Sequence, residues 1–277
     1  MLLKIAICTP LYGVADGKFI QCLSNLHKFF YETPIYDPNG NECEKQLQMF
    51  IVSSSMLTES RHKLTAEAVH WGATHILWLD GDHVFPQDSL HRLLSHNLPV
   101  VGCNYSRRCV PTAPTAAYAE DQVAPGEDRL VYTTREKAEA EIVEEVGHLG
   151  FGVCLIDMKV LDALQFHAEA TGKGSYLPLY QMTVKEDGVG LIGEDVFFFK
   201  KLRDAGIAVH CDHLLSWEIG HITDLIMTAN MAVQQKDAWA ENRRKTREKY
   251  EKRAREAEEA HEAQNAHLEG ATLEAFK

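Results

Sequence analysis

Residues 76–86 read ILWLDGDHVFP, and the interpretation of the rest of the chain starts from this stretch. Four apolar residues at 76–79 run without alternation into Asp80, Gly81 and Asp82. Such a short apolar run is typical of a strand that is covered on both faces at the centre of an α/β sheet. Because ligands of open α/β sheets bind outside the carboxyl ends of the strands, we expect the two carboxylates to face a ligand.

The two carboxylates favour a bound cation. Asp80 and Asp82 lie close together in the sequence, so their charges repel each other unless a cation lies between them. Gly81 has no side chain and lets a ligand approach the backbone closely. The alternative is a strand-ending turn with two solvated aspartates, because a DxD pattern by itself is common.

The composition of the 277 residues is that of a globular protein, with 45% hydrophobic and 25% charged residues. The formal net charge of −12 argues against a general attraction to polyanions. Seven cysteines without a CxxC pair favour reduced, mostly buried thiols and a cytoplasmic location. The N-terminal stretch MLLKIAICTPLYG indicates a first strand rather than a signal peptide. No apolar run approaches the ~20 residues that a membrane span needs.

The order of the expected elements is that of an α/β domain. Strands are expected at residues 2–8, 48–53, 76–79, 99–103 and 207–211, and helices at 19–30, 57–71, 90–95 and 194–205. Residues 136–145 fit a helix or an exposed strand, 147–164 a strand, turn and helix, and 176–182 one strand of a small hairpin. We predict one domain over residues 1–225, with a mixed, mainly parallel sheet flanked by helices.

The composition changes from about residue 234, where Ala, Glu, Lys and Arg dominate. We therefore expect residues 226–277 to form a charged helical extension, either as a long solvated helix or as a partly disordered tail. Residues 243–255 are mostly basic, and residues 256–262 are acidic. A solvated helix with internal ion pairs is one interpretation of this pattern. A contact between oligomer subunits, or a patch that faces phosphate, is the other.

Five features occur in an order and spacing that resemble the nucleotide-sugar-dependent glycosyltransferases with the GT-A fold. They are CTPLYG at 8–13, Arg61, DGD at 80–82, GEDVFFFKKLRDAGIAVH at 193–210, and the pair at 220–221. The arrangement looks like family 2 and related bacterial and phage proteins, so the cytoplasm would be that of the host if a phage encodes the chain. The QxxRW signature of the processive synthases is absent, which argues against a polysaccharide synthase.

The resemblance implies a divalent cation, Mn²⁺ or Mg²⁺, that neutralises the leaving nucleoside diphosphate. Asp82 and His221 would bind this cation directly, and Asp80 would bind it through water or hold the ribose. An oxygen-rich site with one imidazole suits these ions better than a structural zinc.

The resemblance also implies a donor, which we expect to be a UDP-sugar, with GDP as the alternative nucleotide. Tyr12 would stack on the base, and Arg61 would pair with the diphosphate through its planar guanidinium. At each position an ordinary turn or a surface ion pair is the alternative. The residues implied at the nucleotide sugar are Thr9, Pro10, Tyr12, Arg61, Lys63, Asp80, Gly81, Gly150 and Gly152.

Glu194 and Asp195 match the acidic pair of this family at the start of a helix. An inverting transfer of a hexosyl or pentosyl group needs a base for the acceptor hydroxyl, and Asp195 is the expected base, with Glu194 holding the acceptor. The alternative is that both acids only favour a helix N-terminus. The acceptor is left open between a glycan, a protein, a small molecule and modified DNA. Contacts with acceptor or phosphate are expected from Asn104, Tyr105, Arg107 and Arg108.

Two other functions remain open from the sequence. Residues 80–84 also fit the DxDx(T/V) pattern of haloacid-dehalogenase-type phosphatases, in which Asp80 would be the nucleophile. Those enzymes normally begin with this strand, whereas here two strands and two helices precede it. A nucleotide-sugar-binding protein that has lost catalysis is the second alternative, and the presence of Asp82, Asp195 and His221 argues against it.

Overall fold

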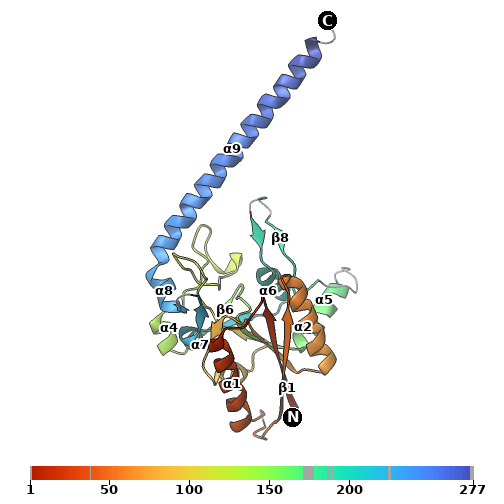
Figure 1. The fold of residues 1–277 in the computed structure, drawn as a ribbon, viewed down its shortest axis with the longest axis vertical. Coiled ribbons are helices and arrows are strands. Elements are labelled where there is room, and N and C mark those ends of the chain that lie inside the picture. Colours follow the sequence, from red (N-terminus) through yellow and green to blue (C-terminus); the bar gives the residue numbers. More distant parts are fainter. Residues whose placement is uncertain are drawn as a thin grey trace.

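The computed structural model describes residues 2–37, 39–170, 178–185, 188, 190–223 and 226–274. Its centre is a seven-stranded sheet with the order β2-β1-β3-β7-β5-β10-β6 (Figure 1). The strands of this sheet are β1 (Leu2–Leu11), β2 (Glu44–Ser53), β3 (His75–Leu79), β5 (Val100–Gly102), β6 (Val143–Val146), β7 (Val153–Asp157) and β10 (Val209–Asp212).

The strand directions confirm the predicted mixed, mainly parallel sheet. Strands β2, β1 and β3 pair in parallel, and β10 pairs in parallel with β5. Strand β7 runs antiparallel between β3 and β5, and β6 runs antiparallel to β10 at the edge. Strands β2, β1, β3, β5 and β10 therefore end at the same edge of the sheet.

Helices cover both faces of the sheet, and each face has its own hydrophobic core. On one face Ala6 and Trp78 pack with side chains from α2, α5 and α6. On the other face Ile7 and Leu77 pack with side chains from α1, α3 and α7. The helices are α1 (Gly17–Glu32), α2 (Leu57–Trp71), α3 (Ser89–Ser95), α4 (Arg135–Glu139), α5 (Lys159–Ala170), α6 (Glu194–Asp204), α7 (His213–Glu218), α8 (Ala229–Gln234) and α9 (Lys236–Glu274), and a 3-10 turn spans Glu120–Gln122.

Two smaller sheets stand beside the large one. A three-stranded sheet has the order β12 (Ile226–Thr228), β11 (Gly220–Ile222) and β4 (His83–Val84), and a hairpin joins β8 (Thr183–Val184) to β9 (Leu191–Ile192). The predicted domain boundary at residue 225 falls between β11 and β12, which pair with each other. Buried Ala229 and Ala232 show that α8 also packs on the body.

Most differences from the predicted elements come from pairing between distant segments. The predicted loop at residues 9–11 continues β1, because Leu11 still pairs with Ser53 of β2. Residues 136–145 contain both alternatives, namely most of α4 and the start of β6. The hairpin strand predicted at 176–182 lies partly outside the described residues, and the observed hairpin begins at Thr183.

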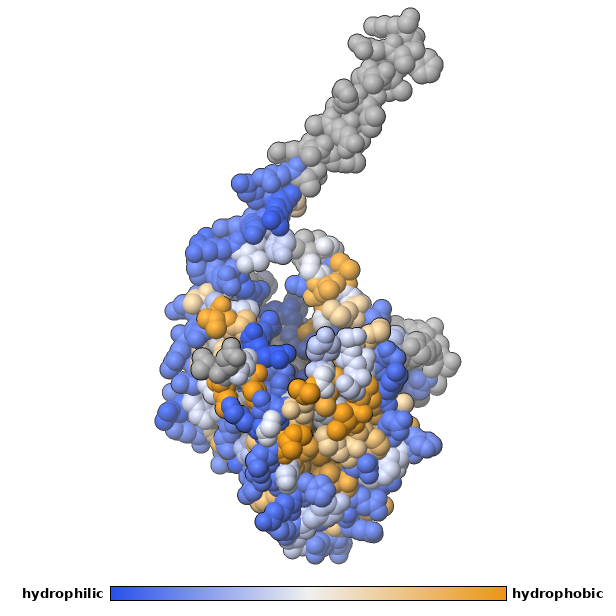
Figure 2. Space-filling view, in the orientation of Figure 1, coloured by the Kyte–Doolittle hydropathy of each residue, from blue (hydrophilic) through white to orange (hydrophobic). Residues whose placement is uncertain are grey.

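Helix α9 extends away from the body (Figure 1), and on the face seen in Figure 2 its described side chains are hydrophilic. Ion pairs one turn apart run along it, such as Arg247 with Glu251 at 2.8 Å. Near its start, Trp239 lies against the guanidinium of Arg107. No helix in the described part of the chain is both long and apolar enough to cross a bilayer.

Candidate functional site

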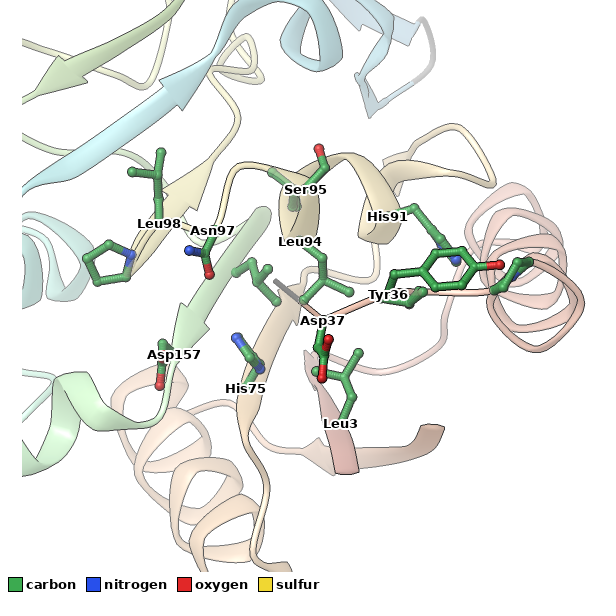
Figure 3. A pocket seen from close by; sticks show the side chains of 15 residues that line it. Leu3, Tyr36, Asp37, His75, His91, Leu94, Ser95, Asn97, Leu98 and Asp157 are labelled. Carbon is green, nitrogen blue, oxygen red and sulfur yellow. The ribbon is translucent and has the colours of Figure 1, made fainter. Parts of the chain in front are cut away.

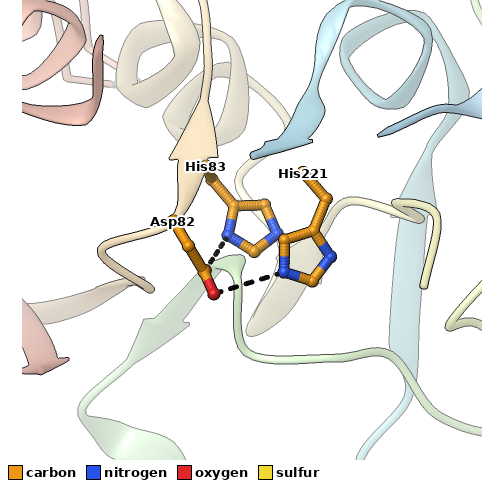
Figure 4. Close-up of side chains that lie close together, drawn as sticks. All are labelled: Asp82, His83 and His221. Atoms are coloured by element: carbon orange, nitrogen blue, oxygen red, sulfur yellow. Dashed lines mark ion pairs between the residues drawn. The ribbon is translucent and has the colours of Figure 1, made fainter. Parts of the chain in front are cut away.

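Three side chains suited to metal binding meet just beyond the carboxyl end of β3. They are Asp82, His83 and His221, and one ligand atom of each lies within 4.8 Å of the others (Figure 4). Asp82 Oδ1 lies 3.0 Å from His83 Nδ1, and Asp82 Oδ2 lies 3.4 Å from His221 Nε2. We call this group the metal cluster. Asp82 and His221 were predicted as direct metal ligands and Asp80 as a ligand through water. The metal cluster contains the first two, does not contain Asp80, and adds His83, which was not predicted.

Pairing between β4 and β11 brings His221 to the cluster. His221 lies opposite His83 in this antiparallel pair, and the backbone N–H of Ile222 donates to the carbonyl of Asp82 at 2.7 Å. The two imidazole rings stack with their centroids 4.3 Å apart and an angle of 21° between their planes. The small sheet thus fixes the distance between residues that lie far apart in the sequence.

The hydrogen bonding of His221 leaves its other nitrogen available as a ligand. Nδ1 of His221 lies 2.9 Å from the carbonyl oxygen of Ser106. A carbonyl can only accept, so Nδ1 carries the hydrogen, and Nε2 is the nitrogen that the neutral ring would offer to a cation beside Asp82. Metal-binding histidines are commonly oriented by an outer carbonyl in this way.

Buried polar atoms in the metal cluster lack partners. His83 is 1% exposed. Both its ring nitrogens and Asp82 Oδ1 make no hydrogen bond, although Oδ1 lies 3.0 Å from Nδ1. Unpaired buried polar groups are costly, and a shared cation would satisfy Asp82 Oδ1 and one of the two ring nitrogens of His83. The residues therefore fit a divalent cation, and two imidazoles with one carboxylate suit Mn²⁺ better than Mg²⁺.

Asp82 is held in its ionised form. Burial acts to raise its pKa, but the close imidazoles of His221 and His83 outweigh burial and hold the pKa of Asp82 well below its usual range. Aromatic packing closes the other side of the cluster, where the Tyr105 ring meets His83 edge to face at a centroid distance of 4.3 Å. A side chain at Gly152 would collide with both His83 and Tyr105. Close packing against these rings explains the glycine at 152.

Arg61 is buried, in contrast to the surface ion pair considered from the sequence. It is 2% exposed and lies between two carboxylates, with Nη2 3.2 Å from Asp80 Oδ1 and Nε 3.2 Å from Glu194 Oε1. Burial opposes the charge of Arg61, but Asp80 and Glu194 outweigh it and raise its pKa. Arg61 therefore joins the end of β3 to the start of α6, and its Nη1 remains buried without a hydrogen bond.

The acidic pair begins helix α6, as predicted. Asp195 accepts a hydrogen bond from the backbone N–H of Val196 at 2.7 Å. Burial and then the neighbouring charge of Glu194 raise the pKa of Asp195 to about 6. The charges of Asp80 and Asp195 both act on buried Tyr105, whose pKa burial raises well above its usual value. Tyr105 thus stands between the metal cluster and the acidic pair.

A pocket with a volume of about 420 Å³ opens beside the metal cluster. This volume is within the usual range for small-molecule sites. Tyr12 on its rim is 84% exposed, so its ring is free to stack on a planar group. The lining includes six predicted residues and several that were not predicted: Pro10, Leu11, Tyr12, Val14, Ser54, Ser55, Leu57, Asp80, Gly81, Asp82 and Arg108.

Other residues predicted to bind the nucleotide sugar do not line this pocket. Thr9 is fully buried, and its hydroxyl has no hydrogen-bond partner. Lys63 lies on the exposed side of α2, where it pairs with Glu59 at 2.6 Å. A side chain at Gly150 would collide with the hydroxyl of Tyr105, so packing against protein explains this glycine too.

The residues predicted to contact the sugar acceptor make hydrogen bonds within the protein, to different degrees. The side-chain amide of buried Asn104 donates to Val131 O at 2.7 Å and Thr133 Oγ1 at 3.2 Å, and its oxygen accepts from Ala116 N at 3.1 Å. Both of its donors are therefore used to hold the 111–133 segment. Tyr105 accepts from Gly152 N at 3.0 Å.

The two arginines of the acceptor set behave differently from each other. Arg107 donates to Pro114 O at 3.1 Å. Arg108 reaches the metal cluster, with Nη1 2.9 Å from Asp82 Oδ2.

A larger pocket of about 750 Å³ lies at the opposite edge of the sheet (Figure 3). Leu3 and His75, near the amino ends of β1 and β3, line it together with Asp157 at the end of antiparallel β7. None of the predicted site residues lines this pocket. Size alone would favour it, but the metal-binding side chains and the acidic pair lie at the other edge.

No known protein family matches the sequence, and no curated protein matches it either. Solved structures with a similar fold include A197 from STIV, with 14% identity and a TM-score of 0.46 over 83% of this chain and 92% of that chain. The catalytic domain of Drosophila beta1,4galactosyltransferase 7, in complex with xylobiose, has 14% identity and a TM-score of 0.39 over 75% of this chain and 64% of that chain.

A third structure is GalNAc-T7 with UDP, GalNAc and Mn²⁺, with 11% identity and a TM-score of 0.41 over 80% of this chain and 44% of that chain. The present chain spans less than two thirds of the length of the second and third structures. At these identities and TM-scores, the three structures assign no role to any residue of this chain.

Proposed function

We propose that this protein is a metal-dependent glycosyltransferase that moves a sugar from a nucleoside diphosphate, with UDP as the expected nucleotide, to an acceptor hydroxyl. The observation that supports it is the metal cluster itself, in which Asp82, His83 and His221 converge with unpaired ligand atoms beside a pocket. A bound divalent cation, for which we favour Mn²⁺, supplies Lewis-acid stabilisation of the leaving diphosphate. Asp80 would contact this cation through water or hold the ribose.

The pocket residues would position the donor. Tyr12 stacks on the base with its exposed ring, and Pro10 and Gly81 shape the floor beneath it. Ser54 and Ser55, which follow β2, offer hydroxyl donors to the ribose or phosphates, whereas the backbone N–H of Ser54 already donates to Leu11 O at 3.1 Å. Such convergent contacts place the anomeric carbon for attack and supply much of the rate enhancement.

Asp195 takes the proton of the acceptor hydroxyl as the hydroxyl attacks the anomeric carbon. A base whose pKa is about 6 is largely ionised at pH 7 and still accepts a proton readily. The transfer then inverts the anomeric configuration. Arg61, which pairs with Glu194 and Asp80, keeps the acidic pair in place beside the end of β3.

The test is a panel of nucleotide sugars with Mn²⁺, measured by thermal stabilisation and by sugar hydrolysis. We expect stabilisation by one nucleotide only when Mn²⁺ is present, together with slow hydrolysis of its sugar. Both signals should disappear in Asp82→Asn. Asp204→Asn is the matched control, because Asp204 is an exposed carboxylate that pairs only with Lys200 among the described residues. If Asp82→Asn kept both the stabilisation and the hydrolysis, the proposed role of Asp82 in metal binding would be excluded.

The same panel, with a simple phosphate ester added, separates the two alternatives from the proposed function. Turnover of a simple phosphate ester, without binding of any nucleotide, would favour the phosphatase. The ion pair that ties Asp80 to buried Arg61 argues against Asp80 as a nucleophile. Nucleotide binding without hydrolysis or transfer would favour a binding protein.

A further inference from the structure

Arg108 is paired with a carboxylate oxygen of Asp82 in the metal cluster, where a cation would also bind. Its Nη1 lies 2.9 Å from Asp82 Oδ2, and this oxygen is also the one that faces His221 Nε2 at 3.4 Å. A guanidinium and a divalent cation on one carboxylate oxygen repel each other strongly at such distances. Arg108 and the cation therefore compete for Asp82.

Arg108 is also free to move away. Its side chain is 54% exposed, and it lies in a segment outside any helix or strand. Its neighbour Arg107, by contrast, donates to Pro114 O and lies against the Trp239 ring. Displacement of Arg108 from Asp82 thus breaks one partly exposed ion pair.

The charge balance of the pocket gives the displaced arginine a partner. Among the described residues that line it, Asp80 and Asp82 are the acids and Arg108 is the only cation. Arg61 approaches Asp80 but is buried and does not line the pocket. A nucleoside diphosphate adds further negative charge, and a guanidinium binds phosphate oxygens in a bidentate way.

We infer that Arg108 couples metal binding to nucleotide binding by exchanging Asp82 for the diphosphate. This inference rests on the proposed function and adds how binding of the cation and binding of the nucleoside diphosphate depend on each other. A cation alone must displace Arg108 without compensation, whereas a cation with a nucleoside diphosphate gives Asp82 and Arg108 one new partner each. The two ligands therefore bind with positive cooperativity, and the coupling is reciprocal.

Calorimetry with Mn²⁺ and UDP on the full chain tests this exchange. In the wild type we expect saturating UDP to tighten Mn²⁺ binding at least about fivefold, the lower end of typical couplings. In Arg108→Gln we expect Mn²⁺ alone to bind more tightly than in the wild type, and the gain from UDP to become smaller, because only the direct contact between cation and diphosphate remains. Arg108→Lys keeps the charge without the planar fork and should retain part of the gain.

The matched control is Arg247→Gln, which removes an exposed arginine paired with a carboxylate on α9 and should leave the coupling unchanged. Full coupling in Arg108→Gln would overturn the inference and leave the proposed function standing. Weaker Mn²⁺ binding in Arg108→Gln without UDP would also overturn it, since Arg108 would then support the metal. If the wild type binds neither Mn²⁺ nor UDP, the proposed function fails and the inference fails with it.

Discussion

Two groups of buried polar side chains lie close to the sheet, and they differ in how well their atoms are paired. In the first, which we call the polar network, His213 is fully buried between Thr133 Oγ1 and Glu144 Oε1, each 2.8 Å away. The second is the metal cluster, where His83 is equally buried and neither ring nitrogen has a hydrogen bond.

The carboxylates of the two regions differ in the same sense. Burial acts to raise the pKa of Glu144, but His213 and Lys137 outweigh it and lower this pKa to about 2. The pKa of Asp195, beside the metal cluster, is raised to about 6. A network in which every polar group is paired stabilises one structure. Unpaired ligand atoms and the raised pKa of Asp195 are instead typical of a functional site.

The largest expected effect is on the rate in Asp195→Asn. Removal of a general base lowers the rate by about 10²–10⁴-fold, so we expect transfer to fall by that factor. The affinity for Mn²⁺ should remain at the wild-type value, because Asp195 is not in the metal cluster. Rate assays and Mn²⁺ titration of the same preparation measure both. A variant with normal turnover would remove Asp195 from the mechanism.

The next effect is on metal binding in His83→Gln. Loss of an outer partner of a metal site costs up to about 100-fold in affinity, so loss of the ligand itself should exceed that. Thermal stability without metal should change little, since the two ring nitrogens make no hydrogen bond that the variant would break. Mn²⁺ affinity by calorimetry and melting temperature with a chelator test the two expectations. An unchanged affinity would reduce the metal cluster to Asp82 and His221.

The corresponding experiment in the polar network is His213→Leu, which should affect stability and not metal binding. Thr133 and Glu144 would each lose a buried partner, and an unsatisfied buried group costs about 1–3 kcal/mol. We therefore expect denaturant unfolding to show a loss of stability in that range. Mn²⁺ affinity should stay at the wild-type value. If instead His213→Leu abolished metal binding with little loss of stability, the distinction between the two regions would not hold.

The smallest expected effect is the pH dependence of the rate. Because the pKa of Asp195 is about 6, the rate should rise with pH and level off above that value, with about a tenth of the maximum at pH 5. The same carboxyl binds a proton more tightly when folded than when unfolded, so its contribution to stability decreases as pH rises toward 6. Rates measured from pH 5 to 8 in the wild type and in Asp195→Glu show directly whether the rise of the rate with pH depends on this carboxyl group. A profile that is flat between pH 5 and 7 would rule out this assignment.

Local sequence signals predicted the elements whose formation depends on nearby residues. The apolar run at 76–79 correctly predicted a strand buried on both faces. Helix α2 has the predicted bounds, because Gly72 adopts a left-handed conformation with φ of 73° and ends it. Asp82 and His221 were found through the resemblance, and the structure brings them together.

The missed features depend on contacts between distant segments. His83 follows Asp82 directly, and the sequence DGDH was a usable signal, but its role depends on pairing with β11. The burial of Arg61 depends on Glu194, which is 133 positions away in the chain. Likewise, the amide of Asn104 is engaged by residues up to 29 positions away, which no local pattern reveals.

The pairing of β4 with β11 has a consequence for the order in which the protein is made. Translation produces the DGD segment long before His221, so the nascent chain can complete much of the large sheet while one metal ligand is still missing. A ribosome-bound intermediate that ends before β11 would therefore contain the central strands but no complete cation site. The metal cluster is therefore completed late in synthesis, when β11 pairs with β4.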